Sequence, residues 1–476
     1  MSIGVYPPGP KVSRLDGFKL ATRRRYILEF LMNVAGEYGD IAHFQIGSKR
    51  VFVLNHPDYI KDALVRYYES FAKRRPQDPE TRRFLGRGLL TSEGEFHRRR
   101  RQLIQPLFQK QQFSKHEAVI MEAGVAVRDS WRHGQQLDIM REMKGLTRQI
   151  ISKMLFDGTA AAEVDEVSEL LTLVLSQFSP FGSTLGALVA KLPMSRARRA
   201  HKAQWALNGI VSGLIAKHRE SSRTHKDILS VLISAQDEPV RGQQSDDQLL
   251  HDEVTTLYLA GHETTGTALG WTCYLLAKDQ AVQAKLHAEL DTVLGSRLPE
   301  LADVPHLRYV KMVFAEALRI YPPIWVLGRY LVKAFETGGY LLPEGSVVVI
   351  SQYLMHHDRR FFPEPWRFDP ERWTPEAKAT RPQFSYFPFG GGPRGCVGEG
   401  LSWITGPLLI AAMAQRWRMH LVQSKPIELQ PRLTLQPKGK IFIRLERRDV
   451  DASQLTRTHS HALVSNWSRQ GCPAHK

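Results

Sequence analysis

The segment best suited to chemistry is a glycine-rich stretch near the C-terminus, FPFGGGPRGCVGEG, at residues 387–400. A helical pattern follows it from Leu401 to Trp417. A cysteine just before a helix meets unpaired backbone N–H groups and the positive end of the helix dipole, and both favour thiolate over thiol. Cys396 is therefore a candidate nucleophile or anionic metal ligand. A phosphate-binding loop or a plain turn is the alternative, although the segment lacks the Gly-Lys-Ser/Thr ending of a phosphate loop.

A second candidate site lies midway along the longest helical pattern, from about Asp246 to Lys278, where residues 260–265 read AGHETT. The apolar residues just before this motif indicate that the helix is buried. Glycine inside a helix costs about 1 kcal/mol relative to alanine, and threonine can bond a backbone carbonyl and bend the helix. A departure from local preference inside a buried element indicates a functional site, and a kink that serves packing alone is the alternative.

Two further patterns place polar side chains on one helix face. Glu316 and Arg319 are three residues apart, so a carboxylate and a guanidinium share a face, although chance pairs of this kind are common. His97 and Arg101 are four residues apart, within a basic run that reads HRRRR. A charge run of this kind is usually a solvated surface.

The composition excludes several classes of protein. The chain has 476 residues, 42% of them hydrophobic and 24% charged, which is typical of a globular protein and not of a disordered one. Its three cysteines are too few for a disulfide framework, which favours a reducing, cytoplasmic setting. The N-terminus lacks a signal peptide pattern, and no segment suits an integral membrane span. The net charge of +17 comes from scattered basic clusters without a nucleic-acid-binding motif, so an acidic protein partner is expected instead.

The chain pattern is mostly helical, with a small amount of strand. Helices are expected over about 57–330 and 399–417, and strands over about 40–56, 330–352 and 430–446. Two hairpins are expected within these strand regions, Ala42–Ile46 with Val51–Leu54 and Tyr340–Leu342 with Val347–Ile350. The fold class is therefore mainly α with a small β region (α+β). We expect a single domain over 1–449 and a flexible tail over 450–476.

The motifs together identify a family. Residues 389–398, Phe-x-x-Gly-x-Arg-x-Cys-x-Gly, match the haem-binding signature of the cytochrome P-450 family at every fixed position. The 260–265 motif resembles the family's oxygen-binding groove, and Glu316-x-x-Arg319 lies where the family expects it. Residues 368–373, FDPERW, resemble the Pro-Glu-Arg-Phe element with tryptophan in place of phenylalanine. The resemblance covers about residues 94–398 and implies a long central helix over the haem, with the cysteine loop before a C-terminal helix.

The resemblance also implies how a haem b group would be held. Cys396 is its thiolate and metal ligand, and Ala260, Phe389 and Gly398 border it. The two propionates need charge-assisted partners. The positions that match the family's propionate partners are His97, Arg101, Arg329 and Arg394.

Catalytic and structural roles follow from the same resemblance. Thr264 hydrogen-bonds O2 at the iron, and Glu263 relays the protons used to cleave the O–O bond. Glu316, Arg319 and Arg372 form a buried three-way ion network that holds the cysteine loop.

The implied activity is a haem-thiolate monooxygenase that hydroxylates or epoxidises an apolar small molecule of the terpenoid, fatty acid, steroid or polyketide class. Because the chain has no flavin or ferredoxin-like segment, two electrons come from a ferredoxin or flavodoxin-type partner with its NAD(P)H reductase. Arg98, Arg99 and Arg100 are candidate docking charges for an acidic donor. We expect a monomer.

Two alternatives remain at this point. A peroxide-driven or isomerase-type enzyme of the same fold would dispense with the acid–alcohol pair, which is present here as Glu263-Thr264. A non-catalytic haem-binding or basic nucleic-acid-binding protein would not need the oxygen groove.

The substrate pocket is predicted from family position only. Its expected lining residues are Phe84, Leu257, Ile324, Trp325 and Leu327. The segment over 170–190 is expected to form part of an access lid.

Overall fold

The computed structural model describes residues 6–22, 24–73, 86–157, 170, 195–220, 227–234 and 246–448. Three expectations fall outside these residues: the pocket residue Phe84, nearly all of the 170–190 segment, and the tail over 450–476.

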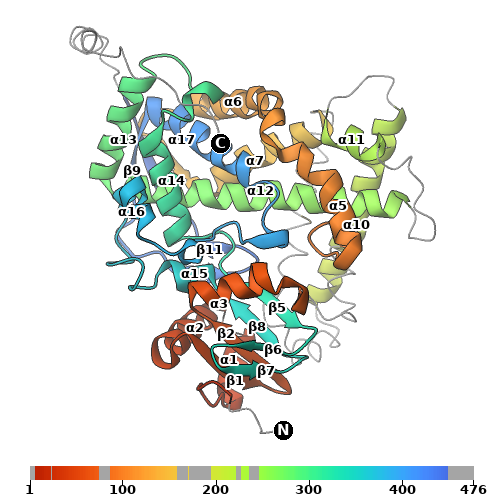
Figure 1. Ribbon diagram of the computed structural model, residues 1–476. Helices are drawn as coiled ribbons and strands as arrows, with labels where there is room; N and C mark the ends of the chain where they lie inside the picture. The colour runs from red at the N-terminus through yellow and green to blue at the C-terminus, as the bar shows by residue number, and fades with distance from the viewer. Residues whose placement is uncertain are drawn as a thin grey trace, which may run out of the picture.

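The molecule is a helical body with a small sheet at one end, built around the long helix α12 (Asp246–Lys278) that crosses its middle (Figure 1). The bounds of α12 are those predicted from the sequence. The other α-helices of the described residues are α1 (Arg14–Thr22), α2 (Arg24–Tyr38), α3 (Pro57–Lys61), α5 (Gly94–Ile104), α6 (Phe113–Ser130), α7 (Ile139–Phe156), α10 (Ser195–Glu220), α11 (Ile228–Ser234), α13 (Gln280–Val293), α14 (Arg308–Ile320), α15 (Gln352–His356), α16 (Pro375–Ala379) and α17 (Glu399–Arg416).

Glycines on α12 allow α7 to pack closely along it. A Cβ atom at Gly261 would lie 2.6 Å from the Ile151 side chain, and one at Gly266 would lie 2.7 Å from the Thr147 hydroxyl. Both distances are far too short for a real contact. The helix-interior glycine that the sequence marked as unusual therefore has a packing role as well as its place in the oxygen-groove motif.

The largest sheet combines strands from both parts of the chain, in the order β1–β2–β8–β5–β3. Its strands are β1 (Ile41–Ile46), β2 (Lys49–Leu54), β8 (Val347–Ile350), β5 (Leu327–Leu331) and β3 (Phe71–Ala72). β1 and β2 form the first predicted hairpin. β8 lies parallel to β2 and antiparallel to β5, so this sheet joins the N-terminal segment to residues some 300 positions later.

The second predicted hairpin is wrong. β7 (Tyr340–Leu342) pairs with β6 (Phe335–Thr337) and not with the strand that follows it. The turn between them holds Gly338 and Gly339 at φ +55° and +79°, the left-handed conformation that tight hairpin turns require. The following strand, β8, is instead paired within the larger sheet.

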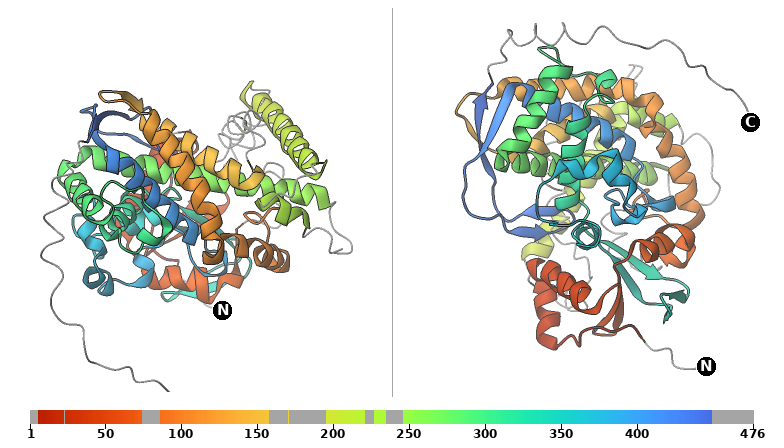
Figure 2. Two further views of the ribbon diagram at one scale, coloured as in Figure 1. Left: turned by 90° about the horizontal axis from the view of Figure 1, so that it is seen from above. Right: turned by 60° about the vertical axis from the view of Figure 1, so that its left-hand side comes forward.

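Two smaller sheets lie against the helical body. β4 (Gln136–Asp138), β12 (Phe442–Arg447) and β9 (Trp417–Leu421) form one, which runs along the edge of the body in the right-hand view of Figure 2. β10 (Leu429–Pro431) and β11 (Leu435–Pro437) form the other. β3 and β4 are short strands inside a span that was predicted as helical. Within the described ranges, none of the helices has the length and apolar character that a bilayer span requires.

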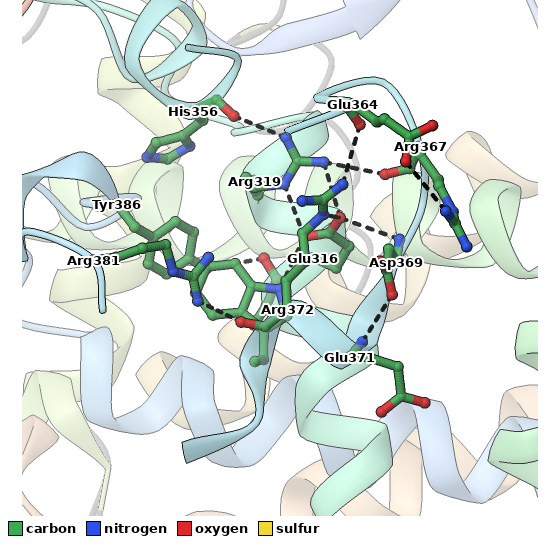
Figure 3. A network of polar contacts seen from close by, with 12 residues as sticks. Glu316, Arg319, His356, Glu364, Arg367, Asp369, Glu371, Arg372, Arg381 and Tyr386 are labelled. Atoms are coloured by element: carbon green, nitrogen blue, oxygen red, sulfur yellow. Dashed lines mark hydrogen bonds and ion pairs between the residues drawn. The ribbon is translucent and has the colours of Figure 1, made fainter. Parts of the chain in front are cut away.

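Figure 3 shows an ion network around Glu316 and Arg319 of α14. The Glu316 carboxylate accepts hydrogen bonds from Arg319 Nε at 2.8 Å and Nη2 at 2.9 Å, and the Arg372 Nε atom lies 3.4 Å from it. The structure thus brings together the three residues predicted to form this network. The Trp373 indole N–H donates to Glu316 at 2.9 Å, so the tryptophan that replaces the family's phenylalanine adds a donor.

His356 connects this network to the loop. Arg319 Nη1 donates to the backbone carbonyl of His356 at 2.8 Å, and His356 Nε2 accepts from the Phe387 backbone N–H at 3.0 Å. Burial holds the pKa of His356 well below its ordinary value, so the ring stays neutral and can accept. Phe387 is the first residue of the glycine-rich segment, so the network fixes where that segment starts.

The network predicts a large loss of stability when the charge of Glu316 is removed. Glu316→Gln leaves two guanidiniums beside a side chain that is 0% exposed, and the free energy of unfolding should fall by about 3–5 kcal/mol. Urea unfolding measures the change. Glu371→Gln is the matched control, because Glu371 pairs with Lys285 on the surface at 2.8 Å and should cost less than about 1 kcal/mol. Equal effects of the two substitutions would contradict the prediction.

Candidate active site

The glycine-rich loop folds back on itself immediately before α17. The Cys396 backbone N–H donates to the Phe389 carbonyl at 2.9 Å, which closes the loop. Gly392, at φ +65°, sits where a Cβ atom would lie 2.0 Å from the Leu64 carbonyl oxygen. The glycine at position 392 thus allows the loop to pack closely against the backbone of Leu64.

The surroundings of Cys396 suit a metal ligand better than a free nucleophile. The side chain is exposed, yet burial raises the pKa of the thiol, while the Gly398 N–H and the Arg101 guanidinium act to lower it. The Gly398 N–H thus favours the thiolate, in the direction predicted from the sequence, but desolvation of the side chain has the larger effect on the pKa. Exposed surface on a desolvated side chain indicates that Cys396 faces an interior space. A bound metal ion removes the thiol proton outright.

A cluster of basic side chains lies beside the loop. Arg101 Nη1 donates to the Gly395 carbonyl at 2.7 Å, and Arg394 Nη1 donates to the Ser92 carbonyl at 2.6 Å. The charges of the cluster perturb one another, which shows that its members are close. Its members are Lys73, His97, Arg101, Arg329 and Arg394.

The cluster carries more positive charge than its surroundings balance. Burial, together with the nearby charges of Arg329 and Arg394, lowers the pKa of Lys73 to about 7. Burial likewise lowers the pKa of His97 to about 3 and that of Arg329 to about 10. Glu93 offsets part of the charge, because it pairs with Arg394 and accepts the Lys73 backbone N–H at 2.7 Å.

This surplus fits a haem. Two propionates would supply the missing negative charge, and the Cys396 sulfur would bind the iron. All four predicted propionate partners lie in the cluster. Lys73 was missed: in the sequence it begins the basic run KRR, which cannot be told from a solvated surface.

One face of α12 is open at the centre of the molecule. Residues 250–259 are all buried, whereas Ala260 is exposed and Thr264, one turn later on the same face, is partly exposed. The Thr264 hydroxyl donates to the Ala260 carbonyl at 2.7 Å. Both residues therefore border a space, as expected for the oxygen groove.

Glu263 is anchored by residues that the sequence did not reveal. Its Oε1 atom accepts from Lys144 Nζ on α7 at 3.1 Å, from Thr434 Oγ1 at 2.8 Å and from Gln436 Nε2 at 2.9 Å. These partners lie more than 100 positions away in the chain, so no local pattern announces them. Burial lowers the pKa of the neighbouring His262 to about 4, so its ring is neutral at pH 7.

The predicted pocket lining needs correction. Ile324 and Leu327 are partly exposed, and Leu327 lies beside Gly390 of the glycine-rich loop. Trp325 is 1% exposed and packs under the large sheet, with its indole N–H donating to the Arg432 carbonyl at 2.9 Å. It is a core residue and not a pocket residue. Leu257 is 5% exposed and packs in the main core, so it offers the space almost no surface.

One of the three candidate docking arginines is also excluded. Arg100 turns inward and pairs with the buried Glu253 at 2.8 Å. Arg98 and Arg99 are both 61% exposed and lie 2.7 and 3.6 Å from Glu95 on their own helix.

Comparison with known proteins supports this description. The sequence profile of the cytochrome P-450 family matches residues 7–444. Cyclooctatin synthase of Streptomyces melanosporofaciens is 37% identical over 412 residues, which cover 86% of this chain and 89% of that protein. Cyclooctat-9-en-7-ol 5-monooxygenase of the same organism is 33% identical over 409 residues, covering 86% and 88%. Pentalenene oxygenase of Streptomyces avermitilis is 27% identical over 427 residues, covering 88% and 93%.

The fold is matched by a solved structure. The crystal structure of the cytochrome P-450DA haem domain aligns with a TM-score of 0.83, covering 94% of this chain and 99% of that one at 22% identity.

The basic cluster predicts opposite effects of Lys73→Met with and without haem. In the haem-free protein the pKa of Lys73 is about 7, against an ordinary 10.5. The lysine therefore destabilises the folded state fully below pH 7, and less as the pH rises toward 10.5. Lys73→Met should raise the haem-free melting temperature at pH 7 and change it less at pH 9.

With haem bound, the same substitution should speed haem loss several-fold, because a propionate partner is gone. Transfer of haem to apomyoglobin measures that rate. Lys333→Met, at an exposed turn lysine, is the control and should change neither quantity. Unchanged haem loss in Lys73→Met would show that Lys73 does not meet a propionate.

Proposed function

This chain belongs to the cytochrome P-450 family, and on that premise we propose that its monooxygenase activity acts on a terpenoid. Two relatives are named for the oxidation of cyclooctat-9-en-7-ol and of pentalenene. These names favour the terpenoid class over the fatty acids, steroids and polyketides that the sequence alone left open. Insertion of one oxygen atom consumes one O2, two electrons and two protons, and yields the oxidised product and water.

The observation that carries the proposal is the open face of α12 with an acid anchored next to it. Haem bound through the Cys396 thiolate supplies the chemistry of O2 activation. The Thr264 hydroxyl, held by the Ala260 carbonyl, has lone pairs free to accept a hydrogen bond from a group in the space. A peroxide-driven enzyme or an isomerase would need no such acid–alcohol pair.

Protons reach this face from solvent through Glu263. Lys144 is 30% exposed and contacts a carboxylate that is only 14% exposed, so the pair links the surface to the interior. Thr434 and Gln436 hold the same oxygen atom and fix the carboxylate in place. Glu263 is therefore placed to relay a proton from the Lys144 side of the helix toward Thr264, the next residue on α12.

The two electrons come from a separate ferredoxin or flavodoxin-type protein with its own reductase. Arg98 and Arg99 on α5 are the docking charges that remain once Arg100 is excluded, and α5 also carries Arg101, which binds the cysteine loop. We further propose that residues 1–449 act as one domain, as a monomer, in the cytoplasm. The family profile spans residues 7–444 without a break, which supports the single domain.

The substrate class is tested with a panel of terpene hydrocarbons and terpene alcohols, with matched fatty acids and steroids as comparison compounds. We expect a low-to-high spin shift with terpenoids alone. With a surrogate ferredoxin and reductase under 18O2, the product should carry one labelled oxygen atom. A product whose added oxygen atom comes only from labelled peroxide would identify a peroxide-driven enzyme. An isomerised product without any label would identify an isomerase.

The proton route predicts that Thr264→Ala uncouples the enzyme. NADPH use should continue while product per NADPH falls about tenfold or more. The variant loses the hydroxyl that assists proton delivery, and general acid–base assistance is typically worth a factor of about 100 or more. Thr264→Ser keeps the hydroxyl and should retain most of the coupling. Full coupling in the alanine variant would contradict the route.

The electron route predicts a salt-sensitive effect of Arg98→Glu. Reduction by an acidic ferredoxin should slow several-fold at low ionic strength, and the difference should shrink as salt is added. Arg25→Glu is the control, because Arg25 is 59% exposed and also pairs with a glutamate on its own helix, but lies on α2. An equal rate for the parent and Arg98→Glu would exclude this docking surface.

A further inference from the structure

Two neighbouring acids on α12, Asp252 and Glu253, are buried although the catalytic steps do not use them. Asp252 is 4% exposed and Glu253 is 0% exposed. A carboxylate inside a protein is costly unless several donors satisfy it. Gln248 on the same helix donates to Asp252 Oδ1 at 2.9 Å, and the other donors to these two acids come from one loop and from α5.

Glu253 holds both a side chain and a backbone group. Its Oε1 atom accepts from Arg100 Nε at 2.8 Å, and its Oε2 atom accepts from the Leu89 backbone N–H at 3.0 Å. Burial raises the pKa of Glu253, and Arg100 and the Leu89 N–H act against that rise. One carboxylate thus ties both α5 and the preceding loop to α12.

Asp252 holds the start of the same loop. Its Oδ2 atom accepts from the Arg87 backbone N–H at 2.7 Å. A Cβ atom at Gly86 would lie 2.0 Å from the Asp252 carboxyl carbon, and one at Gly88 would lie 2.4 Å from the Thr256 hydroxyl oxygen. The loop therefore rests on α12 with no room for side chains at these two positions.

The other end of the loop is fixed to the cysteine loop. The Ser92 carbonyl accepts from Arg394 at 2.6 Å, and Glu93 forms an ion pair with the same arginine. The 86–93 loop, defined by Gly86 to Glu93, thus runs from α12 to Arg394. Glu253 precedes Ala260 by seven residues, or about 10 Å along the helix. The loop thus connects the helix that carries the open face with the loop that carries Cys396.

We propose that Glu253 and Arg100 are positioning residues that fix the 86–93 loop and α5 against α12, and so set the shape of the substrate pocket. The inference rests on the proposed function only in calling the space bordered by Ala260 and Thr264 a substrate pocket. Asp252 aligns the first residues of the loop, and Glu253 sets the distance between the loop and the helix that carries His97 and Arg101. A buried pair of this kind contributes a defined geometry more than it contributes stability.

The test is a double-mutant cycle on the haem-bound enzyme with Glu253→Gln, Arg100→Gln and the double variant. Each single variant leaves one buried group without its partner, whereas the double variant leaves two amides that can bond each other. Two quantities are measured: hydrogen–deuterium exchange of the 86–93 amides, and the affinity for 4-phenylimidazole, whose nitrogen binds the iron while its ring occupies the adjoining space. Gln102→Ala is the control on the same helix, because Gln102 is exposed.

We expect each single variant to speed exchange of the 86–93 amides and weaken 4-phenylimidazole binding by about tenfold or more, because one partner of a buried pair is lost. The double variant should return to within about threefold of the parent. The reduced, carbon-monoxide-bound spectrum should keep its thiolate band in all variants. Unchanged exchange in both single variants would overturn the proposal, and so would a double variant as impaired as the singles.

If the single variants lose haem, the test rests on the double variant. Its 86–93 exchange rates and its affinity for 4-phenylimidazole should still lie within about threefold of the parent. Neither readout uses a terpenoid, so failure to find a terpenoid substrate counts against the proposed function and leaves this result intact.

Discussion

The arrangement depends on the balance of charge in the interior of the protein. Behind the cysteine loop, a single carboxylate, Glu316, is matched to two guanidiniums and satisfied by further donors. In front of the loop, among the described residues, Lys73, Arg101, Arg329, Arg394 and the neutral His97 lie near one carboxylate, Glu93. The first cluster is complete without a cofactor and can fix the backbone by itself. The second would be balanced by the two propionates of a haem, and the iron of that haem would keep the Cys396 thiol deprotonated although burial raises its pKa.

The central helix positions both α7 and the 86–93 loop, through residues of different kinds. Its glycines let α7 come close enough for Lys144 to reach Glu263. Its buried acids, Asp252 and Glu253, lie about two turns before Ala260 and hold the loop that leads to α5. Between these regions Ala260 is left exposed. One helix therefore carries the open face and also fixes the position of the 86–93 loop. These two tasks account for the polar residues in a helix that is otherwise buried.

Local patterns in the sequence were sufficient for part of this picture. The bounds of α12, the first hairpin, the cysteine loop and the meeting of Glu316 with Arg319 follow from spacing within a few residues, or from a motif that spacing defines. The errors concern partners that are distant in the chain. β8 pairs with β2 across nearly 300 residues, Arg100 turns toward Glu253, and Trp325 is covered by strands from the N-terminal region. Side-chain type does not tell whether a lysine such as Lys73 faces water or a cofactor, because that depends on which segments fold over it.

The strand order of the large sheet has a consequence for synthesis of the protein on the ribosome. β2 leaves the ribosome early, but its parallel neighbour β8 is made only when about three quarters of the chain has been translated. During that time the hairpin of β1 and β2 presents an unpaired edge, which is the kind of surface that recruits wrong partners. The iron ligand is made later still. A haem held by Cys396 can therefore bind only after most of the chain has been made, and the edge of the N-terminal hairpin stays unpaired by β8 until that strand is made.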